Sequence, residues 1–203
     1  MIRIVAPALA TSVQDQGRFG RRIMGFGRSG AMDPESLRAA NRAAGAWAGS
    51  AGVEFGPGVL VIETTPAGTQ AFGGAPRPGA PWWQTLEVEA GERFELGSLT
   101  EGMWSYLAIG GGVDAQIVMG SRSTSVREGI GAWLAPGDVL TAGAEAAAPE
   151  PPVQPPMTGE IRVIGSLSGE WTVGARVDRM GYQLEGRTVQ GGRSDLHSEP
   201  LLP

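Results

Sequence analysis

Glycine and proline recur along the whole chain and divide it into short apolar runs. The 203 residues include 33 glycines and 15 prolines. Because both residues interrupt helices but fit the turns that connect strands, this spacing favours β structure. Apolar residues make up 41% of the chain and charged residues 18%, which is typical of a globular protein with its own core. The sequence therefore predicts a mainly β fold, arranged as a barrel or a sandwich.

One segment has the periodicity of a helix instead. Asp33 can cap a helix, Pro34 fits the first helical position, and Glu35 suits the positive end of the helix dipole. Gly49 is a plausible stop. We therefore expect one short helix near residues 34–48, with a shared face formed by Leu37, Ala40, Ala44 and Trp47.

The strands are expected on both sides of this helix. The strongest apolar run, Met103–Ile109, predicts a central strand, and Gly56-Pro57-Gly58 predicts a hairpin between Val53–Phe55 and Val59–Glu63. The stretch before the helix, residues 6–31, is rich in glycine, arginine and serine and predicts a long ordered loop. Further short strands are expected at residues 2–5, 70–72, 86–88, 93–96 and 138–141.

A change of composition indicates a domain boundary. Residues 143–157 are rich in alanine, proline and glutamate, which favours an extended linker over a packed element. We therefore predict a main β domain at 1–142 and a second β segment at 158–203, which looks truncated. Within that second segment, short strands are expected at 160–164, 171–173 and 182–184.

Three residue types are absent or nearly absent, and their absence excludes whole classes of chemistry. The chain has no cysteine, so disulfides, thiolate catalysis and cysteine-ligated zinc are excluded. His197 is the single histidine, so no histidine cluster can bind a metal, and no metal site is expected. All 16 basic residues are arginine, which excludes a lysine nucleophile, a lysine Schiff base and a Walker-type lysine.

Charge and hydropathy limit the partners. The net charge is −5 without a basic cluster, a poor match to nucleic-acid binding. No apolar run approaches the ~20 residues that span a bilayer, and the first residues lack the pattern of a signal peptide. A soluble cytoplasmic protein without a membrane or nucleic-acid partner is the expectation.

Candidate chemistry lies in four clusters where polar residues sit among glycines. Backbone amides can reach a ligand at such places. The clusters are Thr11–Arg18, Ser29–Asp33, Gly110–Gly112 with Gly120–Thr124, and Asp178–Tyr182.

Each cluster also has a purely structural interpretation. Asp15 and Arg18 could form a local ion pair, as could Asp178 and Arg179. Asp33 is more often a helix cap than a catalytic acid at such a position. The glycine triplet could be a tight turn, and it lacks the strand–glycine–helix pattern of a dinucleotide site. Alternatively, Arg122 could bind a carboxylate or phosphate, with hydroxyls and glycine amides completing an anion site.

The same clusters resemble a family that is variously called the C subunit of 5-oxoprolinase, allophanate hydrolase subunit 2, KipA-like or biotin-dependent carboxyltransferase-like. Thr11–Arg18 is similar to its T-x-Q-D-x-G-R signature, and Gly120–Thr124 matches G-S-R-S-T. Tyr106–Gly112 is similar to Y-L-A-V-x-G-G, and Val177–Gly186 resembles S-D-R-M-G-Y-R-L-E-G. Ser29–Asp33, Asn41 and Glu54 match S-G-A-M-D, A-N and L-E in the same order.

The resemblance implies a cyclophilin-like β-barrel and a role in the ATP-dependent opening of 5-oxoproline to glutamate. It implies partner subunits B and A, with ATP bound in the complex. It also implies a small carboxylate or amide substrate. The implied catalytic residues are Asp15, Arg18, Arg122, Asp178 and Arg179. The implied substrate-binding residues are Gln14, Ser29, Met32, Gly111, Gly112, Ser121, Ser123, Thr124 and Met180.

The chain differs from the family in length, since members are usually longer both after Ile164 and after Pro200. Two alternatives to an enzyme subunit therefore stay open. One is a non-catalytic module that binds a small carboxylate or serves as a scaffold. The other is a component of a biotin-dependent carboxyltransferase acting on urea-like amides, with the biotinyl lysine on another chain.

Overall fold

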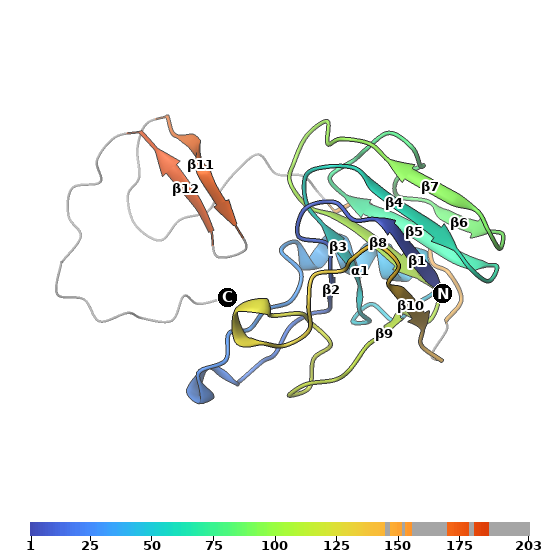
Figure 1. Ribbon diagram of the computed structural model, residues 1–203, viewed down its shortest axis with the longest axis horizontal. Coiled ribbons are helices and arrows are strands. Elements are labelled where there is room, and N and C mark those ends of the chain that lie inside the picture. The colour runs from blue at the N-terminus through green and yellow to red at the C-terminus, as the bar shows by residue number, and fades with distance from the viewer. Residues whose placement is uncertain (145–146, 152, 156–169, 179–180, 187–203) are drawn as a thin grey trace. The chain divides into compact units, whose positions relative to one another are not determined.

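The computed structural model describes residues 1–144, 147–151, 153–155, 170–178 and 181–186 (Figure 1). The chain divides into two compact units, Met1–Pro156 and Met157–Pro203, and each is described by itself. The first unit contains strands β1 to β10 and one α-helix. The second contains β11 and β12. The predicted linker boundaries at 143 and 157 stay a prediction.

The first sheet of the larger unit is built around the N-terminal strand. Its order is β7 (Arg93–Leu96), β4 (Leu60–Thr64), β1 (Ile2–Ala6), β10 (Val139–Ala142) and β9 (Val113–Asp114), with antiparallel pairing throughout. Side chains alternate along β1, so that Ile2 and Ile4 are buried and Arg3 is exposed. Arg3 lies opposite Glu63, and Glu63 lies opposite Arg93. Opposite charges therefore alternate across the solvent face, an arrangement that favours this register.

The second sheet has the predicted central strand in its middle. Its order is β2 (Ser12–Gln14), β3 (Gly52–Phe55), β8 (Ser105–Ile109), β5 (Gly68–Gly74) and β6 (Thr85–Val88). All five residues of β8 are buried. The central strand expected from the apolar run 103–109 is therefore confirmed. Its sequence is a nearly continuous apolar run because both of its faces are covered.

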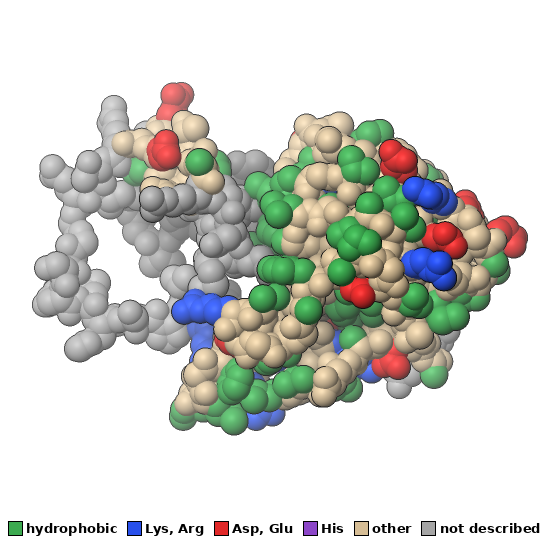
Figure 2. Space-filling view, viewed as in Figure 1, with side chains coloured by type: hydrophobic (Ala, Val, Ile, Leu, Met, Phe, Trp, Pro, Cys, Tyr) green, Lys and Arg blue, Asp and Glu red, His purple; other side chains and the backbone are tan. Residues whose placement is uncertain are grey.

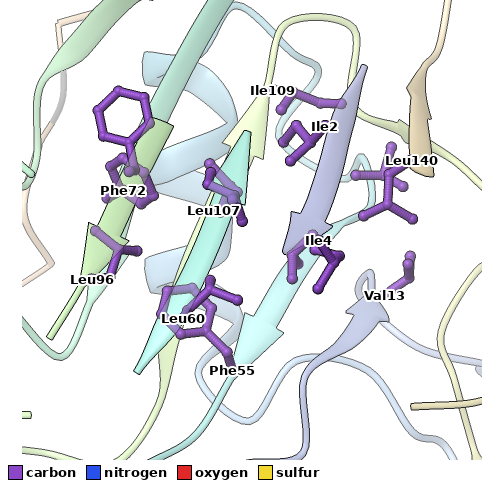
Figure 3. Close-up of a cluster of buried hydrophobic side chains, with 14 of the residues drawn as sticks. Ile2, Ile4, Val13, Phe55, Leu60, Phe72, Leu96, Leu107, Ile109 and Leu140 are labelled. Carbon is purple, nitrogen blue, oxygen red and sulfur yellow. The ribbon is translucent and has the colours of Figure 1, made fainter. Parts of the chain in front are cut away.

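The main core contains the inward side chains of both sheets (Figure 3). Leu107 and Ile109 of β8 belong to the same cluster as Ile2 and Ile4 of β1, and Phe72 of β5 stacks edge-on against Phe94 at 5.6 Å between ring centroids. Each fully buried side chain of this kind stabilises the fold by roughly 1.5–3 kcal/mol. The two sheets are thus held together mainly by aliphatic and aromatic burial.

The helix α1 (Pro34–Ala43) packs on the other face of the second sheet. Its Ala40 and Ala43, with Ala44 just beyond its end, form a small cluster with Ala71 of β5 and Ala108 of β8. The small alanine side chains in this cluster allow the helix backbone to approach the sheet closely. The predicted cap is confirmed, because the Asp33 carboxylate accepts from the Ser36 amide at 3.1 Å.

The helix ends five residues earlier than predicted. Gly45 adopts φ +75°, its amide donates to Arg42 O, and the Ala46 amide donates to Asn41 O at 2.8 Å. This pair of bonds is a Schellman motif, which closes a helix at a left-handed glycine. Trp47 therefore lies beyond the helix and is 68% exposed, so it does not belong to the helical face.

The predicted hairpin around Gly56-Pro57-Gly58 is wrong. β3 belongs to the second sheet and β4 to the first, so this turn crosses between sheets. The buried guanidinium of Arg77 holds the crossing, because it donates to the carbonyls of Gly56 and Gly58 and to Ser105 Oγ at 2.9 Å. Burial lowers the pKa of Arg77 to about 10, so the group still carries its charge at neutral pH.

The long loop expected at 6–31 contains two short elements, β2 and the 3-10 turn η1 (Arg22–Met24). A second such turn, η2 (Val126–Glu128), follows the G-S-R-S-T segment. In the smaller unit, β11 (Thr172–Asp178) and β12 (Gly181–Glu185) form an antiparallel hairpin, while the strand expected at 160–164 lies outside the described residues.

The predicted mainly β fold with one helix is confirmed. The strands of the larger unit form two five-stranded sheets, so the arrangement is a barrel only in a loose sense. Within the described residues, no helix is long and apolar enough to cross a membrane.

Candidate functional site

The Asp15 carboxylate is the centre of the polar cluster at the end of β2. Its Oδ1 accepts from the Gly17 amide at 2.8 Å, from Ser121 Oγ at 2.6 Å and from Ser123 Oγ. Its Oδ2 accepts from the Arg122 amide at 2.6 Å. Two of the clusters expected from the sequence, more than 100 residues apart, are therefore joined by one carboxylate.

The Arg18 guanidinium also links these two segments, through backbone carbonyls of the second one. The side chain is 2% exposed, and it donates from Nε to Val118 O at 3.2 Å and from Nη2 to Ser123 O. Its Nη1 is buried without a hydrogen-bond partner among the described residues. The suggested ion pair between Asp15 and Arg18 is not formed among the described residues: Asp15 accepts from hydroxyls and amides, and Arg18 donates to backbone carbonyls.

Gln14 contributes a third link. Its Nε2 donates to Ser12 Oγ at 2.9 Å and to Thr124 O at 3.2 Å, and the Thr124 amide donates to Val13 O at 2.9 Å. Gln14 Oε1 is buried without a partner in the described structure. The edge strand β2 is thus covered by the G-S-R-S-T segment, which protects its backbone groups from pairing with other chains.

The Ser29–Asp33 segment runs beside the Asp15 loop. The Ala31 amide donates to Asp15 O at 2.9 Å, and Ser29 adopts φ +53°, an unusual conformation for a residue with a side chain. A Cβ on Gly17 would lie 2.7 Å from Arg28 O, and one on Gly30 would lie 2.9 Å from the Gln16 carbonyl carbon. Glycine at both positions is what allows the two loops to approach this closely.

A buried carboxylate also anchors the second loop, and sequence reasoning did not assign it to the site. Glu54 on β3 is fully buried, and its Oε2 accepts from the Met32 amide at 2.7 Å and from Tyr106 OH at 3.0 Å. The tyrosine oxygen in turn accepts from the Asp33 amide at 2.7 Å. Glu54 and Tyr106 both lie in motifs noted in the sequence. A polar residue at a strand position that faces the interior is the signal that could have assigned them to the site.

Arg122 lies at the wall of a cavity of about 190 Å³. Its Nη2 pairs with Asp114 Oδ1 at 3.1 Å, while its Nε is buried without a partner among the described residues. Apolar side chains form most of the cavity wall, and Asp138 adds a carboxylate. The lining residues are Val13, Ala115, Gln116, Val118, Arg122, Ser123, Thr124, Ile130, Gly131, Ala132, Trp133, Leu134 and Asp138.

Most backbone amides of the expected anion site are bonded within the chain, and the site itself stays a prediction. The Arg122 amide donates to Asp15, the Ser123 amide to Ser121 Oγ, and the Ser121 amide to Val118 O. Gly111 and Gly112 donate to Gly45 O and Ile109 O, and both adopt left-handed φ values in a tight turn. These amides satisfy the protein's own carbonyls and side chains, so they offer no cradle to a ligand.

The remaining predicted residues belong to the smaller unit. Asp178 ends β11 opposite Gly181, while Arg179 and Met180 lie outside the described residues, as does His197. Within the described ranges, no three histidine or acidic side chains gather in a way that could hold a metal ion.

The mainly β fold of this chain is shared with solved structures, among them that of TTHA0988. Residues 24–203 match the family described as "Carboxyltransferase domain, subdomain A and B", and the chain belongs to this family. The resemblance noted in the sequence is thereby confirmed.

Three relatives illustrate the similarity. The chain is 32% identical to the 5-oxoprolinase C subunit of Escherichia coli over all of this chain and 74% of that protein. The crystal structure of TTHA0988 is 31% identical, with a TM-score of 0.78 over 96% of this chain and 81% of that one. The K. lactis urea amidolyase structure is 25% identical, with a TM-score of 0.77, and the match covers 92% of this chain but 14% of that much longer one.

Proposed function

We propose that the chain is the C-type component of an ATP-dependent 5-oxoprolinase, which opens 5-oxoproline to glutamate together with partner subunits B and A. The observation that carries this proposal is the similarity to the C subunit of a 5-oxoprolinase along the whole chain. A second such relative, from Haemophilus influenzae, is 29% identical over 94% of the chain. The activity belongs to the complex, and this chain contributes one wall of its site.

The Arg122 cavity is the place where this chain would hold the substrate. The volume of about 190 Å³ is small and suits a small cyclic acid. The guanidinium of Arg122, which lines the cavity, can donate to its carboxylate, and the apolar wall suits the methylene groups of the ring.

Asp15 has a positioning role in this proposal. Both of its oxygens already accept hydrogen bonds from the chain, and its donors fix the backbone of Ser121, Arg122 and Ser123. A carboxylate occupied in this way is poorly placed to take a proton from water or from an amide. Its effect on catalysis would therefore pass through the orientation of Arg122.

The Arg122 cavity is a poor match to ATP. The cavity is small for a nucleotide, since pockets for drug-sized ligands span about 300–1,000 Å³. The amides of the Gly110–Gly112 triplet are bonded internally, and the chain has no lysine. We therefore propose that ATP is bound by a partner protein of the complex, where phosphorylation of the lactam oxygen would make the ring carbon a better electrophile.

The relatives favour one second candidate, a carboxyltransferase component acting on a urea-like amide. The urea amidolyase of Lachancea kluyveri is 32% identical over 84% of this chain and 10% of that protein. The same cavity could hold such an amide. A carboxybiotin would have to arrive on another chain, because this one has no lysine to carry it.

Reconstitution tests the proposal. The chain is purified with its candidate B and A subunits, and glutamate release is measured with ATP and 5-oxoproline, for each protein by itself and for the full mixture. Turnover is expected only in the full mixture. Arg122→Ala is expected to raise KM at least tenfold, because the charged donor to the substrate carboxylate is lost. Arg93→Ala, an exposed arginine on β7, is the matched control and should leave turnover unchanged.

Two results would contradict the proposal. A stable complex of all three proteins without turnover would contradict the 5-oxoprolinase function. Turnover that needs bicarbonate, urea and a biotinylated partner would instead support the carboxyltransferase. An Arg122→Ala complex with unchanged KM would reject the cavity as the carboxylate site.

A further inference from the structure

The segment 19–27, here called the finger, projects from the body of the larger unit and carries η1 at its end (Figure 1). Ile23 is 94% exposed, Phe19 61% and Met24 56%. Single exposed apolar residues are ordinary, but three large ones within six positions make a coherent apolar tip. Figure 2 shows hydrophobic side chains gathered at the end of this projection, with basic side chains beside them.

The finger is also the most basic part of a chain whose net charge is −5. Between residues 18 and 28 there are four arginines and no acidic residue. Arg21 is exposed at the tip, and the Arg28 guanidinium lies 4.3 Å from the centroid of the Phe19 ring, which presents that ring together with a positive charge. The tip therefore fits an apolar pocket with an acidic rim.

Both ends of the finger are fixed to the candidate site. At its base, the Arg18 amide donates to Arg28 O at 2.6 Å, next to the loop held by Asp15. Close to this base, the Gly27 amide donates to the Glu128 carboxylate of η2 at 2.5 Å. The residues that follow η2, Ile130 to Leu134, line the Arg122 cavity. A force on the finger would thus reach both the Asp15 loop and a wall of the cavity.

We propose that the finger is the docking element for a partner protein of the complex, which receives the apolar tip in an acidic-rimmed pocket. This inference rests on the proposed function, because it takes the partner from that complex. Relatives named as subunits make a protein the occupant that the observations favour over a lipid surface or a second copy of this chain. Docking would set the position of the cavity wall, which gives a physical reason for activity to depend on the complex.

The test compares the same substitution at two exposed aliphatic positions. Ile23→Glu places a charge at the tip, and Leu9→Glu places one at the other end of β2, where Leu9 is 67% exposed. Each purified full-length variant is titrated separately against the purified B and A subunits. We expect Ile23→Glu to raise the Kd by about 30-fold or more, the size of an interface hot spot, and Leu9→Glu by less than about threefold.

A charge reversal gives a second, independent result. Arg21→Glu is expected to raise the Kd and to reduce its dependence on salt, because the attraction to an acidic rim is screened by ions. Thermal unfolding of all three variants should match the unsubstituted chain, since the altered side chains are exposed.

The outcomes separate this inference from the proposed function. A complex that forms equally well with Ile23→Glu overturns the docking role of the finger and leaves the proposed function intact. Failure of the unsubstituted chain to bind either partner removes the proposed function and this inference with it. Binding of the unsubstituted chain to vesicles of anionic lipid, lost in Ile23→Glu while the affinity for both partners is unchanged, would assign the finger to a membrane. A concentration-dependent dimer lost in Ile23→Glu, again with unchanged affinity for the partners, would assign it to self-association.

Discussion

Replacing Asp15 with asparagine tests whether one carboxylate organises the candidate site. The substitution keeps the size and shape of the side chain and removes its charge. In the native chain, Oδ1 accepts three hydrogen bonds and Oδ2 accepts one from the Arg122 amide. An asparagine oxygen can take the place of Oδ1, but its amide group then faces the Arg122 amide, so that two donors oppose each other.

The magnitude follows from this count. A hydrogen bond to a charged group contributes about 1.5–3 kcal/mol and a neutral one about 1 kcal/mol. The variant loses the Arg122 bond and weakens the three others. Because Asp15 is partly exposed and water can compensate in part, we expect a loss of about 2–4 kcal/mol in the free energy of unfolding.

Urea unfolding followed by tryptophan fluorescence and circular dichroism measures this loss. With a slope of about 2 kcal/mol per molar urea, the midpoint should fall by about 1–2 M. Asp138→Asn is the matched control, because that exposed carboxylate accepts a local hydrogen bond of 2.8 Å from the Ala135 amide, three residues away. If the two variants shift the midpoint equally, the central role given to Asp15 is wrong.

Three further substitutions, one of them paired with a control variant, test the elements around the site. Arg77→Met should lower the free energy of unfolding by about 3–5 kcal/mol, since it leaves buried carbonyls without donors. A loss below about 1 kcal/mol in denaturant titration would contradict the role of Arg77 at the sheet crossing. Tyr106→Phe should cost about 1–2.5 kcal/mol and speed amide hydrogen exchange at Met32, because Glu54 loses a donor; unchanged exchange would show that the tyrosine does not hold this loop. Gly111→Ala should lower the free energy of unfolding, measured by thermal unfolding, by more than about 2 kcal/mol, because φ is +81° and the new Cβ would lie 2.3 Å from Gly143 O. Its control is Gly120→Ala, with φ +85° and open space around the Cβ position, which should lower it by about 1 kcal/mol.

The sequence by itself determined the class of the fold and its local elements. Glycine and proline spacing predicted a mainly β chain, the run before Gly110 predicted the central strand, and Asp33-Pro34 predicted the start of the helix. These features are local, because turn residues, caps and apolar runs act on their immediate neighbours. The motifs were also enough to indicate the family, since their order along the chain is specific.

Only the tertiary structure decided which strands pair and what each polar residue does. The turn at Gly56–Gly58 has a hairpin sequence, yet the demand to bury both sheets against one core sends β3 and β4 into different sheets. Asp15 and Arg18 suggest an ion pair by spacing, but Asp15 is satisfied by Ser121 and Ser123, and Arg18 by backbone carbonyls. Contacts across a hundred residues depend on how the whole chain closes, and a local pattern carries no information about them.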